Sequence, residues 1–204
     1  MALGLVVAGC SNDDSTTEAA PSSSSAATSA PSSASPDSAP GQARAMPDAT
    51  ADYSSLLITP EAIPEGVGVF IADPPQLNPN GVAGAAQLLH TAENSALIGD
   101  TVLLTESTAK AEAALEKSKE GIGASVTGTP VPVPSISPNA VMTAGTSPDG
   151  AKAVTLLLFS EQNALVSLEF DSAPGDLNPV PADFVEQVGL AQQEAIKTGL
   201  PNVG

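Results

Sequence analysis

The residue with the most specific chemical context in this sequence is its single cysteine, Cys10. It follows the apolar residues Leu5-Val6-Val7 and the small residues Ala8-Gly9, and a tract of Ser, Ala, Thr and Pro begins directly after it. A structural cysteine is usually buried as a small apolar side chain, but nothing around Cys10 could bury it. Small residues before a cysteine fit the narrow cleft of a signal peptidase, and the thiol can then accept a lipid.

The segment VVAGCS resembles the bacterial lipoprotein signal, or lipobox. This resemblance implies that Cys10 receives diacylglycerol and palmitate, and that the chain is anchored by this lipid to the extracytoplasmic face of the cell membrane. A complete signal peptide also needs a basic start and an apolar stretch of about 7–15 residues. Residues 1–9 contain no Lys or Arg. We therefore interpret them as a truncated signal-peptide remnant and expect the true start codon upstream.

The rest of the sequence contains little that suggests catalysis. His90 is the only histidine, so a serine nucleophile would need it as the base, and no G-x-S-x-G motif is present. A histidine-based metal site is excluded for the same reason. We expect His90 to be a surface or partly buried strand residue.

Glu169, Asp171 and Asp176 lie in the segment EFDSAPGD. Paired carboxylates can serve in glycoside hydrolysis or hold Ca²⁺, but this spacing matches no calcium loop. The chain has no Trp and one Tyr, which leaves few rings for stacking on a sugar. We interpret the segment as a solvated loop after a strand, and we predict a protein that is not an enzyme and needs no metal or cofactor.

Charge narrows the classes of partner. The chain has 6 Lys and Arg against 23 Asp and Glu, a net charge of −17. Nucleic acid is therefore excluded as a partner, because phosphate neutralisation needs basic residues, and so is electrostatic docking on anionic lipid. No apolar run reaches the ~18 residues of a membrane-spanning helix.

Residues 10–52 combine the lipidation site with a tract of Ser, Ala, Thr, Pro, Asp and Gly. This tract has no hydrophobic periodicity and cannot bury enough apolar surface to offset the entropy of ordering. We predict a disordered tether, which as a flexible coil would span roughly 36 Å. Its Ser, Thr and Pro content also suits O-glycosylation.

Residues 53–204 are predicted to form one α+β domain. Residues 56–58 form a short apolar element, residues 67–71 a short strand and residues 74–81 a loop. Strands are expected at 87–91 and 96–104, and the Pro-Val alternation at 129–135 predicts an edge strand or a polyproline II segment. Ser147-Pro148-Asp149-Gly150 predicts the turn of a hairpin, and a further turn leads to a strand whose Val166, Leu168 and Phe170 share one face.

Two helices complete the prediction. The first begins with Thr108 as N-cap and ends at Gly121, and its apolar stripe consists of Ala111, Ala114, Leu115, Ser118 and Ile122. The second runs from about Pro181 to Leu200, and its stripe consists of Phe184, Val188, Ala191 and Ala195. The order β-β-α-β-β-β-α gives an antiparallel sheet with two helices packed on it.

The small residues of the first helix suggest a place for a ligand. If Ala111, Ala114 and Ser118 face Val154, Leu156 and Leu158 on the sheet, they could leave room for an apolar molecule. Close packing of the helix on the sheet is the alternative. A cavity would favour a ligand-binding module, and a flat apolar patch would favour a protein-interaction domain. A hydrolase would require His90 in a cleft beside a Ser and a carboxylate.

The arrangement of lipobox, Ser/Ala/Pro tether and small α+β domain resembles small lipoproteins of mycobacteria and other actinobacteria, of the LpqN/LpqT type. The similar part is the closing half, including MTAGTSPDGAKAVTLLLFSEQNALVSLEF. That resemblance implies a PsbP/Mog1-like sandwich at the cell envelope. The segment YSSLLITPEAIP, residues 53–64, also resembles the opening of extracellular sensor domains of actinobacterial receptor kinases. We predict a non-catalytic binding module of the cell envelope for an apolar or envelope-derived ligand, and the alternative is a protein-interaction or sensor-like accessory domain at the cell surface.

Overall fold

The structure of the chain, a computed structural model, describes residues 46–203. Cys10, the signal-peptide remnant at residues 1–9 and tether residues 10–45 lie outside the described residues. Within residues 46–203 the first buried side chain is that of Tyr53.

One antiparallel sheet of eight strands organises the described residues, in the order β1-β3-β4-β8-β7-β6-β5, with β2 also paired to β3. The long hairpins β3–β4 and β7–β8 lie side by side because β4 pairs with β8. The strands are β1 (Phe70–Ala72), β2 (Gln76–Leu77), β3 (Gly84–Thr91), β4 (Ala96–Leu104), β5 (Val131–Pro132), β6 (Val141–Thr146), β7 (Ala153–Glu161) and β8 (Ala164–Ser172). The predicted α+β class, with an antiparallel sheet and two helices, is confirmed.

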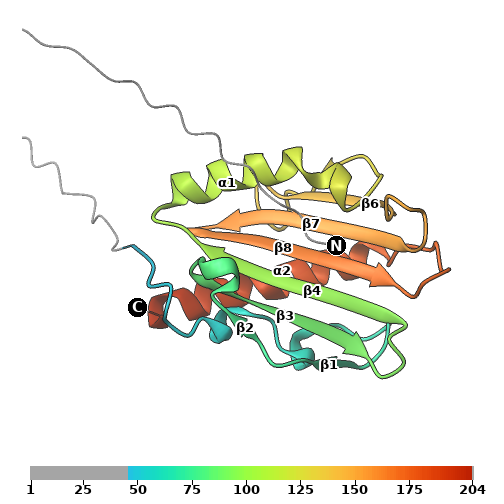
Figure 1. Cartoon of the computed structure of the whole chain (residues 1–204), viewed down its shortest axis with the longest axis horizontal. Coiled ribbons are helices and arrows are strands. Elements are labelled where there is room, and N and C mark those ends of the chain that lie inside the picture. The colour runs from blue at the N-terminus through green and yellow to red at the C-terminus, as the bar shows by residue number, and fades with distance from the viewer. Residues whose placement is uncertain (1–45, 204) are drawn as a thin grey trace, which may run out of the picture. The chain divides into compact units, whose positions relative to one another are not determined.

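Two α-helices, α1 (Thr108–Glu120) and α2 (Ala182–Gly199), lie on opposite faces of the sheet. Five 3₁₀ turns complete the described chain, at Ser54–Leu56, Pro60–Ala62, Pro79–Gly81, Ile122–Ala124 and Leu200–Asn202. In Figure 1, α2 lies behind the sheet and α1 runs beside β7 at the upper edge.

Strict alternation along β4 and β8 separates the two faces. Every second residue of each strand is buried and those between are partly exposed, as expected when side chains alternate across a sheet. The buried face carries Ile98, Val102, Leu168 and Phe170, and it packs against α2. There the rings of Phe170 and Phe184 form a T-shaped pair at a centroid distance of 6.2 Å.

On the other face of the sheet, α1 packs against β7. Leu115 of α1 forms a second apolar cluster with Val154, Leu156 and Leu158 of β7, and Ile122 and Val126 extend it. The predicted hairpins, the turn at residues 147–150 and the edge position of residues 131–132 are all present. The side of α1 that carries Glu112, Glu116 and Lys117 is exposed to solvent.

Several predicted boundaries were wrong. The N-cap of α1 is Ser107, not Thr108: its extended backbone precedes the helix, and its Oγ accepts a hydrogen bond from the Lys110 N–H at 3.3 Å. Residues 74–81 are not wholly a loop, because Gln76–Leu77 pairs with β3 and Pro79–Gly81 forms a 3₁₀ turn. The strand predicted at residues 87–91 begins at Gly84.

The prediction missed β2, which is two residues long and leaves little periodic signal. β1 overlaps the strand predicted at residues 67–71, and β5 lies in the segment predicted as an edge strand or polyproline II. The apolar element at residues 56–58 is the end of a 3₁₀ turn followed by extended chain. The stripe of α2 was partly wrong: Gln192 and Ile196 are buried, whereas Ala191 and Ala195 are only partly buried. The two alanines face the segment at residues 55–62, where they line a hollow.

Candidate binding surface

The six residues predicted to hold a ligand lie around the contact between α1 and β7. Val154, Leu156 and Leu158 are buried there, 1–6% exposed, and so is Ala111 at 0%. Ala114 and Ser118 are half-buried, and the Ser118 hydroxyl donates a hydrogen bond to the Ala114 carbonyl at 2.9 Å. Between helix and strand, the side chains of Leu115, Ile122 and Val126 contact the three β7 residues.

These six residues do not line any of three hollows on the described residues. One, of about 460 Å³, lies between residues 55–62 and α2 and is mostly apolar. Another, of about 430 Å³, is lined by residues 46–49, 81–83 and 104–106 with Lys110. A third, of about 340 Å³, lies between residues 60–65 and residues 68–70.

A larger feature is the part of the sheet that α1 leaves uncovered. Among residues 46–203 no helix covers β3 and β4 on this side, and Figure 1 shows both strands facing the viewer. We call this surface the open face; the pairing register and alternation assign to it Ile71, Ala86, Leu88, His90, Leu97, Gly99, Thr101, Leu103, Ser167, Glu169 and Asp171.

The open face is unusually apolar for an uncovered surface. Leu88 is 41% exposed and Ile71 is 50% exposed, and the partly exposed Leu97 of β4 lies diagonally across from Leu88. Single exposed apolar residues are common, but contiguous ones mark interaction surfaces. An antiparallel sheet can expose one face when that face is polar. The open face carries exposed leucines and therefore differs from the polar, solvent-exposed face that such sheets usually have.

One row across the open face contains a position without a side chain. The register places Leu88 of β3, Gly99 of β4 and Glu169 of β8 in that order. A Cβ added at Gly99 would meet nothing closer than 3.9 Å, and both of those nearest atoms belong to Glu169. Gly99 therefore leaves a gap in the row between an apolar side chain and a carboxylate.

Glu169 and Asp171 are two residues apart on β8, so both project from the open face. They were predicted to lie in a solvated loop, and this was wrong, because β8 continues to Ser172. Burial chiefly, and the neighbouring Asp171 charge, raise the pKa of Glu169, while Lys152 opposes that rise. Asp176 does lie in the loop after β8, and hydrogen bonds from Asn178 lower its pKa.

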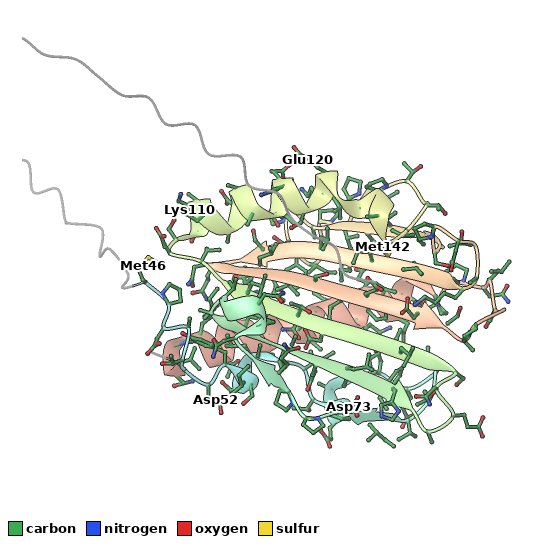
Figure 2. All side chains as sticks on the ribbon, viewed as in Figure 1. Met46, Asp52, Asp73, Lys110, Glu120 and Met142 are labelled. Carbon is green, nitrogen blue, oxygen red and sulfur yellow. The ribbon has the colours of Figure 1, made fainter. Side chains whose placement is uncertain are left out.

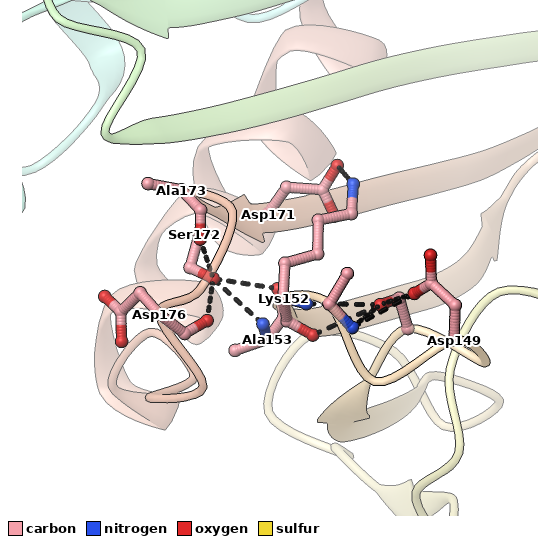
Figure 3. Close-up of polar contacts among 9 residues, drawn as sticks. Asp149, Lys152, Ala153, Asp171, Ser172, Ala173 and Asp176 are labelled. Atoms are coloured by element: carbon pink, nitrogen blue, oxygen red, sulfur yellow. Dashed lines mark hydrogen bonds and ion pairs between the residues drawn. The ribbon is translucent and has the colours of Figure 1, made fainter.

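Lys152 is the cation of this surface. It forms an ion pair with Oδ2 of Asp171 (Figure 3), and Oδ1 of Asp171 is buried without a hydrogen-bond partner in the described residues. The turn before β7 positions Lys152: the Ser147 hydroxyl donates to Asp149 at 2.6 Å and accepts from the Lys152 N–H at 3.3 Å. At the end of β8, the Ser172 hydroxyl donates to the Asp176 carbonyl at 2.6 Å.

His90 lies on β3, on the side of the open face away from Glu169 and Asp171. Its Nε2 is 3.5 Å from Oδ1 of Asp73, and its Nδ1 is 3.1 Å from the Thr91 carbonyl. Figure 2 labels Asp73 at the edge of the domain near β1. Within residues 46–203 no group of three or more His, Cys, Asp and Glu is placed to hold a metal ion.

Sequence reasoning did not identify Gly99 or Leu88 as surface residues. The alternation of β4 places Gly99 on the opposite face of the strand from Ile98 and Asp100, but the partner strand decides which side chain adjoins Gly99.

No helix in the described part of the chain is long and apolar enough to span a bilayer.

Comparison with known proteins relates the chain to others through its fold. No protein-family model and no curated protein matches the sequence. Among solved structures it is similar to the extracellular domain of PknH from Mycobacterium tuberculosis, with a TM-score of 0.53 and 8% identity over 72% of this chain and 95% of that one. At that identity the likeness shows the fold alone. The resemblance to LpqN/LpqT lipoproteins stays a prediction.

Proposed function

We propose that this chain is a lipid-anchored, extracytoplasmic module of the cell envelope that binds a partner protein through its open face, without catalysis. The observation that carries the binding role is the run of exposed and half-buried apolar side chains on β1, β3 and β4 with no described helix over them. The VVAGCS segment supports the anchor. The fold shared with an extracellular domain supports the location.

The packing around α1 favours a partner protein over a ligand between helix and sheet. Leu115, Ile122 and Val126 occupy the contact with β7. An enclosed ligand needs a cavity, whereas a protein partner needs a contiguous exposed surface. The open face supplies the exposed surface that a protein partner needs.

A second candidate function is binding of a small apolar or envelope-derived ligand in the hollow between residues 55–62 and α2. Its volume of about 460 Å³ and its lining by Leu57, Ala191 and Ala195 favour an apolar molecule. Extraction of the purified protein with organic solvent, followed by mass spectrometry, tests this candidate. A co-purifying lipid that is lost in Ala195→Phe supports it, and its absence opposes it.

The anchor is tested by expressing the full-length gene in an actinobacterial host supplied with an alkyne analogue of palmitate. We expect the protein in the membrane fraction to carry the label and Cys10→Ala to lose both label and membrane association. An unlabelled wild-type protein would overturn the lipid anchor.

The binding surface is tested by site-specific photocrosslinking in the same cells. A photoreactive amino acid at Leu88 on the open face is compared with one at Leu190 on α2, which is 40% exposed and serves as the matched control. We expect a discrete crosslinked protein from position 88 and not from position 190. Equal crosslinking from both positions, or none from position 88, would overturn the assignment of the open face.

A further inference from the structure

The gap at Gly99 has walls of two kinds. Leu88 lies on one side of Gly99 in the cross-strand row and Glu169 on the other. Leu97 and Thr101 lie on the same face of β4, two residues away in each direction. An occupant of this gap would contact apolar carbon on one side and a carboxylate on the other.

The charge at this point is incompletely balanced. Asp171 pairs with Lys152 through one oxygen, and its other oxygen has no partner among the described residues. The Glu169 carboxylate makes no hydrogen bond or ion pair within residues 46–203, although the residue is half-buried. Two adjacent carboxylates therefore share one cation, and an additional positive charge beside Glu169 would complement them.

We propose that the open face binds a lysine or arginine side chain of the partner protein, with its aliphatic stem over Gly99 against Leu88 and its cationic head on Glu169. This inference rests on the proposed function, because it names the chemistry that the same face recognises. Lys and Arg bury their stems on apolar surface while their charged heads stay at its polar margin. The row Leu88-Gly99-Glu169 offers both parts in the required order.

Other occupants fit less well. A divalent metal ion needs more oxygen ligands than Glu169 and the free oxygen of Asp171 supply, and leucines adjoin them. A second copy of this chain carries the same net charge of −17, so two copies repel each other. An anionic lipid headgroup is repelled by Glu169. A basic side chain carries the complementary charge and a stem for the apolar wall.

The experiment is a nuclear magnetic resonance titration of the Cys10→Ser full chain, labelled with ¹⁵N, with two short blocked peptides. The probe is acetyl-Leu-Arg-Leu-amide, and its uncharged counterpart has citrulline in place of arginine. Citrulline keeps the stem and a planar head but has no charge. We expect the arginine peptide to shift the amide signals of Leu88, Gly99 and Glu169 in a saturable way, and the citrulline peptide to bind about fivefold or more weakly.

Variants locate the interaction. Glu169→Gln removes the charge, and Gly99→Val fills the gap with a residue that suits a strand. The space at Gly99 admits a Cβ without a clash, so Gly99→Val is expected to fold with an unchanged unfolding midpoint. Glu112→Gln, on the exposed side of α1, is the matched control. We expect both open-face variants to weaken the arginine peptide about fivefold and the control to leave its affinity unchanged.

The outcomes separate this inference from the proposed function. If both peptides shift the open face equally, or if Glu169→Gln binds as the wild type does, the basic side chain is overturned while the open face remains a binding surface. If neither peptide shifts the open face, the inference also fails, and photocrosslinking from position 88 then decides whether the function stands. Signals that move only elsewhere overturn the inference as well.

Discussion

Asp100 and Ile58 are joined by a buried hydrogen bond: the Ile58 N–H donates to Oδ2 of Asp100 at 3.0 Å, where Asp100 is 0% exposed. The same N–H lies 3.1 Å from Oε1 of Gln192, and the Nε2 of Gln87 donates to the Ile58 carbonyl at 2.5 Å. Three side chains from β3, β4 and α2 thus hold the backbone of residues 56–58. Those residues lie near the start of the buried core, which begins at Tyr53.

This arrangement makes stability depend on pH. Burial raises the pKa of Asp100 from 3.8 to about 7, against hydrogen bonds from Ile58 and Gln87. The side chains facing it from neighbouring elements are Gln87, Leu168 and Gln192, and none of them titrates. The folded state therefore keeps a proton that the unfolded chain releases, so the free energy of unfolding falls as pH rises from about 4 through about 7.

Asp100→Asn removes this titration. We expect the variant to resemble the wild type near pH 4, and to be more stable than the wild type above pH 7 by on the order of a few kcal/mol. A smaller decline should persist, because the pKa of Glu169 is also raised. Urea unfolding at pH 4.5, 6 and 8 measures this. An equal pH dependence in both proteins would contradict it.

Gln192 is the second part of the same network. Its Nε2 donates to the Leu56 carbonyl at 2.7 Å, and the side chain is fully buried. Gln192→Leu should lower the free energy of unfolding by about 1–3 kcal/mol, because it leaves that carbonyl without a partner. Hydrogen exchange of residues 56–58 should accelerate. Gln187→Leu, on the exposed side of α2, is the control and should leave both measurements almost unchanged.

Local patterns predicted the parts of the fold whose signal is contained in a short window. The alternation of residues 96–104 gave the bounds of β4 without error, and Pro148-Asp149-Gly150 gave the hairpin turn. These succeed because period-two burial and turn chemistry act within a few residues. The strands of two or three residues have no period, and their pairing with longer strands defines them.

The polar network and the open face could not be predicted in this way. Ile58 and Gln192 are 134 residues apart in the chain, and nothing near either residue indicates the other. The gap at Gly99 depends on the pairing of β4 with β8. These two strands belong to hairpins that are far apart in the sequence but adjacent in the sheet. Amphipathic periodicity also placed the stripe of α2 on Ala191 instead of Gln192, because a buried glutamine counts as polar in the pattern.

Gly199 allows residues 55 and 56 to approach the end of α2. A Cβ at this position would lie 2.7 Å from Cδ2 of Leu56 and 3.0 Å from the Ser55 carbonyl oxygen. Alanine normally favours a helix over glycine by about 1 kcal/mol, but here the clash should reverse the sign and destabilise the protein by about 1–3 kcal/mol. Gly123→Ala, where a Cβ would meet nothing within 4 Å, is the control. A stabilised Gly199→Ala would show that residues 55–56 move away at no cost.

The contact between α1 and β7 gives the last prediction, because it decides whether space for a ligand exists there. Ala111 is 0% exposed beside the cluster of Leu115, Leu156 and Leu158, whereas Ala114 is half-buried one turn later. Added methylenes in a filled core force side chains from their rotamers, so Ala111→Leu should cost about 1–3 kcal/mol. Ala114→Leu can extend toward solvent and should change the free energy of unfolding by less than about 0.5 kcal/mol. Chemical denaturation of both variants measures the difference. If Ala111→Leu is instead as stable as the wild type, an unfilled space lies under α1, and the ligand predicted between helix and sheet would regain its place as the occupant of this domain.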